Sequence, residues 1–103
     1  LSAEAATVLS DGIKDANGAL ASLTFCGNCG EYRTEGDPVT IDITMAEADF
    51  SGKKLGPVGA QILAAFMSTK LFNAKGALVS LDISNNQIGA EGATHLAPAL
   101  QEW

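Results

Sequence analysis

The sequence has few basic residues, and this shortage limits the partners that the chain can take. Six lysines and arginines stand against twelve aspartates and glutamates, so the formal net charge is -6. The basic residues are scattered along the chain, and Lys53 and Lys54 are their one adjacent pair. Binding to nucleic acid, which depends on neutralising phosphates, is therefore disfavoured. The charge fits a basic protein partner or a cation better, although an acidic surface that only favours solubility is the simpler interpretation.

Long apolar runs and cysteines are also scarce. The longest apolar run, near residues 62–67, is far shorter than the roughly 20 residues that cross a bilayer. Two cysteines exclude a disulfide-rich secreted scaffold, but they do not settle the redox compartment. The sequence starts at Leu1 without a basic or apolar leader segment, so targeting information is either absent or already removed. The localisation is therefore unknown, with a cytoplasmic location slightly favoured.

The composition is that of a packed globular protein. Hydrophobic residues make up 47% of the chain and charged residues 17%, and these values exclude a disordered chain. A length of 103 residues allows one domain with a modest core, but not two.

A repeated pattern organises most of the chain, and it is clearest near the C-terminus. Five residues there fill the first, fourth, sixth, ninth and eleventh places of an L-x-x-L-x-L-x-x-N-x-L frame, namely Leu78, Leu81, Ile83, Asn86 and Ile88. The frame describes a short strand and a tight turn, in which the asparagine amide can satisfy backbone groups where the chain bends. Small and apolar residues then recur at helical spacing, namely Gly92, Ala93, Leu96, Ala97 and Leu100. The stretch resembles a leucine-rich repeat of the longer, helix-containing kind seen in ribonuclease-inhibitor-like proteins.

The same pattern recurs twice earlier in the chain, in less complete form. Residues 18–25 repeat residues 76–83 almost place for place, and the frame resumes at Met45, with Lys53 where an asparagine would be usual. The resemblance implies an α/β fold, a short leucine-rich-repeat solenoid with three parallel strands, three outer helices and an inserted β-hairpin. No capping unit is visible at either end. The chain is therefore expected to be a piece of a longer protein, or to have its ends covered by other copies or another subunit.

The predicted elements divide a single domain or fragment over residues 1–103. They are a helix at 3–14, a strand at 20–25, the insertion at 26–45, a strand at 46–50, a helix at 58–68, a strand at 79–83 and a helix at 91–102.

In this fold, the side chains that flank the buried positions of each strand face the open surface of the sheet. They are Ser22, Thr24, Glu47, Asp49, Ser80, Asp82 and Ser84. Thr24, Asp49 and Asp82 share one place in the frame, so we expect a row across strands about 4.8 Å apart. When two carboxylates lie this close together, their repulsion raises the pKa of at least one of them unless a positive charge lies nearby. This row, with Glu47, is a candidate patch for a lysine or arginine of a partner or for a cation, and the alternative is a set of solvated surface acids.

Cys26 and Cys29 form a C-x-x-C motif. Such a pair is redox-active when the first cysteine begins a helix, but this motif follows a predicted strand and precedes a polar segment. A zinc site would need a second pair of ligands, and His95 is the single histidine. The alternatives are a structural disulfide or two free thiols at a turn, half of an intermolecular metal site, and redox catalysis.

No set of residues predicts an enzyme. Residues 52–59 lack the spacing of both glycine-rich phosphate motifs, and nothing places His95 near a nucleophile or the paired carboxylates. We expect no catalytic residue, no cofactor and no metal ion. The first hypothesis is a non-enzymatic protein–protein interaction module that uses the sheet face and the inserted hairpin, because the resemblance implies a recognition surface without naming its ligand. The alternative is a structural subunit that stacks on copies of itself in an assembly or filament, and a thiol redox protein comes last.

Overall fold

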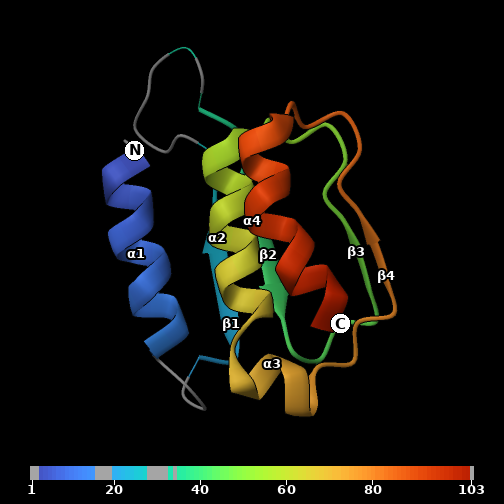
Figure 1. Cartoon of the computed structure of the whole chain (residues 1–103). Helices are drawn as coiled ribbons and strands as arrows, with labels where there is room; N and C mark the ends of the chain where they lie inside the picture. Colours follow the sequence, from blue (N-terminus) through green and yellow to red (C-terminus); the bar gives the residue numbers. More distant parts are fainter. Residues whose placement is uncertain (1–2, 16–19, 28–32, 34, 103) are drawn as a thin grey trace.

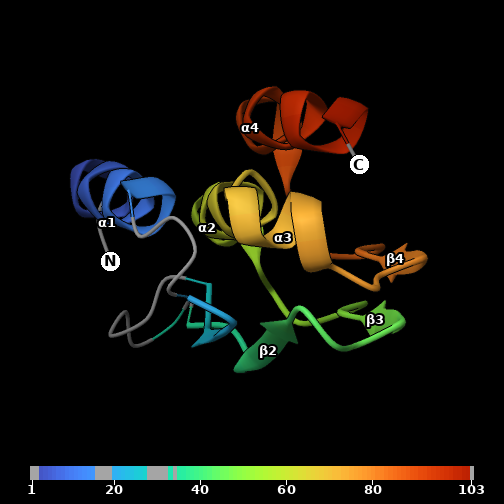
Figure 2. The same cartoon turned by 90° about the horizontal axis from the view of Figure 1, so that it is seen from below.

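The computed structural model describes residues 3–15, 20–27, 33 and 35–102. Within these residues, the elements follow one another as α1 (Ala3–Asp15), β1 (Ser22–Phe25), β2 (Val39–Asp42), β3 (Glu47–Asp49), α2 (Gly56–Met67), α3 (Lys70–Lys75), β4 (Ser80–Asp82) and α4 (Gly89–Glu102). The strands lie along one side of α2, α4 packs on its other side, and α1 packs beside it (Figures 1 and 2). None of the described helices combines the length and the hydrophobicity that a membrane span requires.

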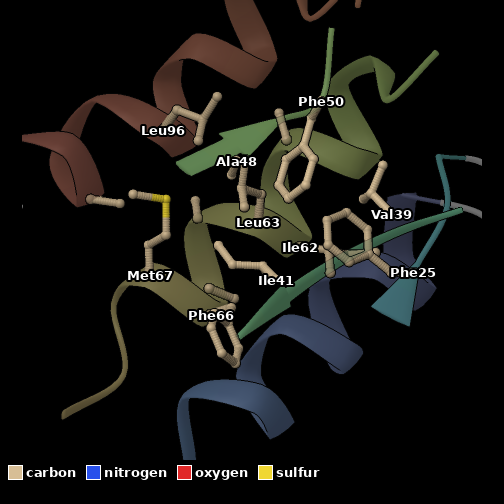
Figure 3. Close-up of a cluster of buried hydrophobic side chains, with 14 of the residues drawn as sticks. Phe25, Val39, Ile41, Ala48, Phe50, Ile62, Leu63, Phe66, Met67 and Leu96 are labelled. Carbon is tan, nitrogen blue, oxygen red and sulfur yellow. The ribbon is translucent and has the colours of Figure 1, made fainter. Parts of the chain in front are cut away.

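Helix α2 is the centre of the hydrophobic core. Eight of its twelve residues are buried, and a helix that is apolar on nearly every side needs neighbours on nearly every side. Its Ile62, Leu63 and Phe66 are at most 1% exposed. The strands, the residue that follows β3 and α4 supply the surrounding side chains in Figure 3, namely Phe25, Val39, Ile41, Ala48, Phe50 and Leu96. The strands are therefore held in place through this one helix.

The strands form two separate two-stranded sheets. β1 and β2 run antiparallel, with Leu23 opposite Ile41. β3 and β4 run parallel, with Ala48 opposite Leu81. No ladder of backbone hydrogen bonds joins the two pairs in the described part of the chain.

The predicted fold class is therefore wrong, because no solenoid of three parallel strands is present in the described residues. The first strand pairs with β2, which lies inside the predicted insertion at 26–45, and not with β3. Val39 and Ile41 of β2 are 5% and 0% exposed, so burial of this apolar face keeps β2 in the layer below α2. At the end of β2, Asp42 Oδ1 accepts hydrogen bonds from the backbone N–H (2.8 Å) and hydroxyl (2.6 Å) of Thr44. This turn leads the chain on toward β3.

A fourth helix, α3, lies between the predicted helix at 58–68 and the predicted strand at 79–83, where no helix is predicted, so the count of three helices is also wrong. The Oγ1 atom of Thr69 caps it by accepting a hydrogen bond from the backbone N–H of Phe72 (3.2 Å). Phe72 is buried against Phe66, with ring centroids 5.7 Å apart. A helix of six residues is too short to show a helical repeat in the sequence.

Asn86 joins the strand–turn–helix unit of β4 and α4 to that of β3 and α2. Its side chain is 2% exposed. Its Oδ1 accepts hydrogen bonds from the backbone N–H of Lys53 (2.9 Å) and of Leu55 (3.2 Å). Its Nδ2 donates to three carbonyl oxygens, those of Phe50 (2.7 Å), Ile83 (2.9 Å) and Ser84 (3.1 Å). The amide thus satisfies backbone groups at the bend, as its place in the frame predicts, and its hydrogen-bonding capacity is fully used.

Replacing Asn86 with alanine should lower the free energy of unfolding by about 3 kcal/mol, because it leaves buried N–H and C=O groups without partners. Urea denaturation followed by circular dichroism measures the loss. Asn73→Ala is the control, since Asn73 is exposed and its Nδ2 donates to the carbonyl oxygen of Thr69 within one helical turn. A similar loss in both variants would contradict the role given to Asn86.

Candidate functional site

The side chains predicted to face the open surface are all exposed. They are Ser22 and Thr24 of β1, Glu47 and Asp49 of β3, Ser80 and Asp82 of β4, and Ser84 just beyond β4. In the parallel pair, Glu47 lies opposite Ser80 and Asp49 lies opposite Asp82. The two aspartates are therefore neighbours across adjacent strands.

Thr24 does not continue the row of Asp49 and Asp82. It lies opposite Thr40 of β2, and the Oγ1 atoms of the two threonines are 2.7 Å apart. Figures 1 and 2 show β2 between β1 and β3. The predicted row of three is therefore interrupted by a strand that the repeat frame did not place in the sheet.

Sequence reasoning missed two residues of this surface, Thr40 and Asp42, because both fall within the predicted insertion. Thr40 lies opposite Thr24, and Asp42 lies opposite Ser22. The signal was present, since residues 39–42 alternate between apolar and polar types and side chains alternate between the two faces of a strand. We call the combined surface the polar strand face, and it consists of Ser22, Thr24, Thr40, Asp42, Glu47, Asp49, Ser80, Asp82 and Ser84.

Three aspartates of the polar strand face are held by the same local hydrogen bonds. Each Oδ1 accepts from the backbone N–H and from the hydroxyl of the residue two places later in the chain. The hydroxyl distances are 2.6 Å for Asp42, 2.6 Å for Asp49 and 2.7 Å for Asp82. The sequence carries this motif three times as Asp-Ile-Thr, Asp-Phe-Ser and Asp-Ile-Ser. These turns fix the direction of each carboxylate at the end of its strand.

The same donors keep two of the aspartates charged. The pKa of Asp49 is lowered from 3.8, first by the Ser51 hydroxyl, then by the Ser51 N–H and in smaller part by the charge of Lys53. The pKa of Asp42 is lowered from 3.8 mainly by the hydroxyl and N–H of Thr44. For Asp49, the pKa thus moves opposite to the direction expected for a close carboxylate pair, because hydrogen bonds stabilise its charged form.

Cys26 is disulfide-bonded, and Cys29, the other cysteine of the chain, lies outside the described residues. The sulfur of Cys26 is 3.9 Å from a carboxylate oxygen of Glu35. This is a contact and not a hydrogen bond, because a disulfide sulfur has no proton to donate. Cys26 follows β1, and neither Cys26 nor Gly27 is helical, so the described residues around it provide no helix N-terminus to activate a redox cysteine. The structural disulfide is the alternative that these observations favour.

His95 lies exposed on α4, on the opposite side of α2 from the strands. It therefore has no place in the chemistry of the polar strand face. In the described ranges of the chain, no group of three or more histidine, cysteine, aspartate or glutamate side chains is arranged to hold a metal ion. The polar strand face offers charge and hydrogen-bonding groups to a ligand.

No protein-family model matches this chain, and neither a search of curated proteins nor a search of solved structures finds a match. The resemblance to leucine-rich repeats therefore stays a prediction that rests on the residues of the chain.

Replacing Ser51 with alanine should raise the pKa of Asp49, because it removes the hydroxyl that most stabilises the carboxylate. Carbon-detected NMR titration of the side-chain carboxyl groups measures this pKa. Ser22→Ala, on the other sheet, is the control and should leave the pKa of Asp49 unchanged. An unaltered Asp49 titration in Ser51→Ala would contradict the proposed cause.

The same shift determines a pH dependence of stability. The pKa of Asp49 in the folded protein is below 3.8, so its stabilising contribution is complete at pH values well above 3.8. The contribution is lost as the pH falls from that range through the lower pKa of the folded state. Ser51→Ala should therefore lose less of its stability than the wild type over this acid range.

Proposed function

We propose that this chain is a non-enzymatic binding module that holds a basic segment of a protein partner on its polar strand face. The observation that carries the proposal is the gathering of four carboxylates on this surface, those of Asp42, Glu47, Asp49 and Asp82. The opposite surface of the strands is packed against α2, so the polar strand face is the side available to a ligand.

The spacing of the acids suits an extended peptide. Glu47 and Asp49 are two residues apart on β3, which corresponds to about 7 Å along a strand. Alternate side chains of an extended peptide have the same spacing, so lysine or arginine at alternate positions can meet both carboxylates. Asp82, directly opposite Asp49, adds a second carboxylate, whose oxygens can accept hydrogen bonds from the planar guanidinium of arginine.

The local hydrogen bonds make the surface ready for binding. Ser51 and Ser84 fix the Oδ1 atoms of Asp49 and Asp82, so little side-chain freedom is lost when a cation binds there. The lowered pKa of Asp49 keeps its carboxylate charged in mildly acidic solution. The neighbouring hydroxyls of Ser22, Thr24 and Ser80 offer neutral hydrogen bonds beside the charged positions.

The test is a combined variant that carries Glu47→Gln, Asp49→Asn and Asp82→Asn. The new amides keep an oxygen acceptor for the turns and remove the charge, so the fold should persist. The ligands are eight-residue peptides with arginine at alternate positions, and fluorescence anisotropy measures their Kd. We expect about tenfold weaker binding, since each exposed ion pair contributes modestly.

A matched control removes the same charge from the helices through Glu4→Gln, Asp11→Asn and Glu91→Gln. It should bind the arginine peptides nearly as well as the wild type. If both variants bind the arginine peptides equally weakly, the binding depends only on the net charge of the protein and not on the polar strand face. A lack of saturable binding to every such peptide would also overturn the proposal.

A second candidate function, a structural subunit that stacks on copies of itself, is favoured by an apolar groove between β4 and α4. The groove has a volume of about 330 Å³, and its lining consists of Ile83, Ile88, Gly89, Ala93, Leu96, Ala97 and Leu100. In the preceding unit, Leu55, Ala60 and Leu63 hold the places that correspond to Ile88, Ala93 and Leu96, and they are fully buried. The residues of the preceding unit are buried because the next unit covers them, with α4 packed on α2 and β4 paired with β3. The occupant proposed for the groove is therefore a strand–helix unit of a second copy.

This candidate predicts that the mass of the chain in solution rises with concentration, which sedimentation velocity measures. Leu100→Lys should prevent the association, because it places a charge in the apolar groove. Gln101→Lys adds the same charge at the next residue of α4, outside the groove, and should associate like the wild type. A wild-type chain that stays a folded monomer at all concentrations would contradict the stacking hypothesis.

A further inference from the structure

A cavity of about 480 Å³ lies at the edge of the fold where β3 and β4 lead into α2 and α4. Its lining consists of Arg33, Gly52, Lys54, Gly56, Pro57, Asn85 and Gln87. Two of the six basic residues of the chain thus line one cavity, and none of the lining residues that the structure describes is acidic. In a chain with twice as many acids as bases, this concentration of positive charge points to an anionic ligand.

We propose that this cavity binds a small phosphorylated molecule that carries hydroxyl groups. Arg33 and Lys54 hold the phosphate, since guanidinium and ammonium groups form strong charge-assisted hydrogen bonds with its oxygens. The side-chain amides of Asn85 and Gln87 donate to and accept from the hydroxyl groups of the remainder. The volume is within the range of small-molecule sites and exceeds what a single phosphate needs. This site is separate from the polar strand face and does not depend on its function.

The first turn of α2 adds to the positive potential of the cavity. Gly56 and Pro57, which begin this helix, are both part of the lining. The N-terminal end of a helix carries a partial positive charge. The first turn of α2 contains no acidic residue to offset this charge, whereas those of α1 and α4 contain Glu4 and Glu91.

The backbone that carries Lys54 is fixed before any ligand binds. Its neighbours Lys53 and Leu55 both donate their N–H groups to the buried Asn86 side chain. Gly36 packs directly on this loop, and a Cβ atom there would come within 2.5 Å of the Lys53 and Lys54 carbonyl oxygens. Lys54 itself has a φ of 56°. A fixed backbone at Lys54 reduces the entropy that is lost when this part of the cavity binds a ligand.

The lining also indicates what kind of phosphorylated molecule fits. None of the lining residues that the structure describes is aromatic, so none of them offers a stacking surface to a nucleobase. Asn85 and Gln87 instead match the hydroxyl groups of a sugar or polyol. A sugar phosphate is therefore favoured over a nucleotide.

The test is an NMR titration of the full chain labelled with ¹⁵N, at constant ionic strength, with glucose 6-phosphate, inorganic phosphate, glucose and AMP as separate probes. We expect saturable shifts of the Gly52 and Gly56 amides and of the Asn85 and Gln87 side chains with glucose 6-phosphate. The hydroxyl contacts should make its binding about fivefold tighter than that of inorganic phosphate. Because none of the described lining residues is aromatic, AMP should bind no more tightly than glucose 6-phosphate. Glucose should not bind.

Substitutions then test whether the side chains of Arg33 and Lys54 bind the phosphate. Lys54→Gln and Arg33→Gln should each weaken glucose 6-phosphate binding about tenfold, and Lys54→Arg should retain it. Lys70→Gln and Lys75→Gln remove the same charge from α3, away from the lining, and should bind like the wild type. The spectrum of each variant also shows whether it is folded.

Three results would overturn the proposal. The first is the absence of saturable shifts with both glucose 6-phosphate and inorganic phosphate. The second is that the α3 control variants weaken glucose 6-phosphate binding as much as the cavity variants do. The third is that folded Lys54→Gln and Arg33→Gln bind glucose 6-phosphate as tightly as the wild type. Tighter binding of AMP than of glucose 6-phosphate would refute the sugar-phosphate assignment. The polar strand face variants leave the cavity intact, so they should keep this binding whatever their effect on arginine peptides.

Discussion

The buried amide of Asn86 is the interaction on which both proposed sites depend. It links the loop after β3 to the loop after β4 through hydrogen bonds to Lys53, Leu55 and Phe50. On one side of these loops, the link supports the register in which Asp49 faces Asp82. On the other side, it fixes the backbone next to Lys54. One side chain therefore supports an acidic surface and a basic cavity at the same time.

Helix α2 provides the second constraint, because it is buried on nearly all sides. Two-stranded sheets have little stability of their own in water. Both sheets of this protein gain theirs by placing one face, through residues such as Ile41 and Ala48, on the common helix. This arrangement leaves the opposite face of the strands free to carry charge, and polar side chains occupy it without cost to the core.

The sequence predicts individual elements better than it predicts their pairing. Helical spacing places the helices at 3, 58 and 91, and the structure starts α1, α2 and α4 at Ala3, Gly56 and Gly89. Alternation in residues 39–42 predicts a strand and its buried side, but a period of two gives no information about which strand lies beside it. That is why the sequence predicts an insertion at 26–45, where the structure has β2 beside β1. The cavity was missed for a related reason, since Arg33, Lys54 and Gln87 belong to separate loops that only the folded chain brings together.

The missing ladder between the two sheets has a consequence for the dynamics of the molecule. Because no ladder of backbone hydrogen bonds joins β2 to β3 in the described residues, opening the hairpin of β1 and β2 does not require the parallel pair to separate. The two halves of the strand layer can then behave as distinct cooperative units, each with its own free energy of local opening. The carboxylates of Asp49 and Asp82 belong to one such unit and that of Asp42 to the other. A ligand that spans the polar strand face would add a link between these two units, which share the core of α2 but no backbone ladder.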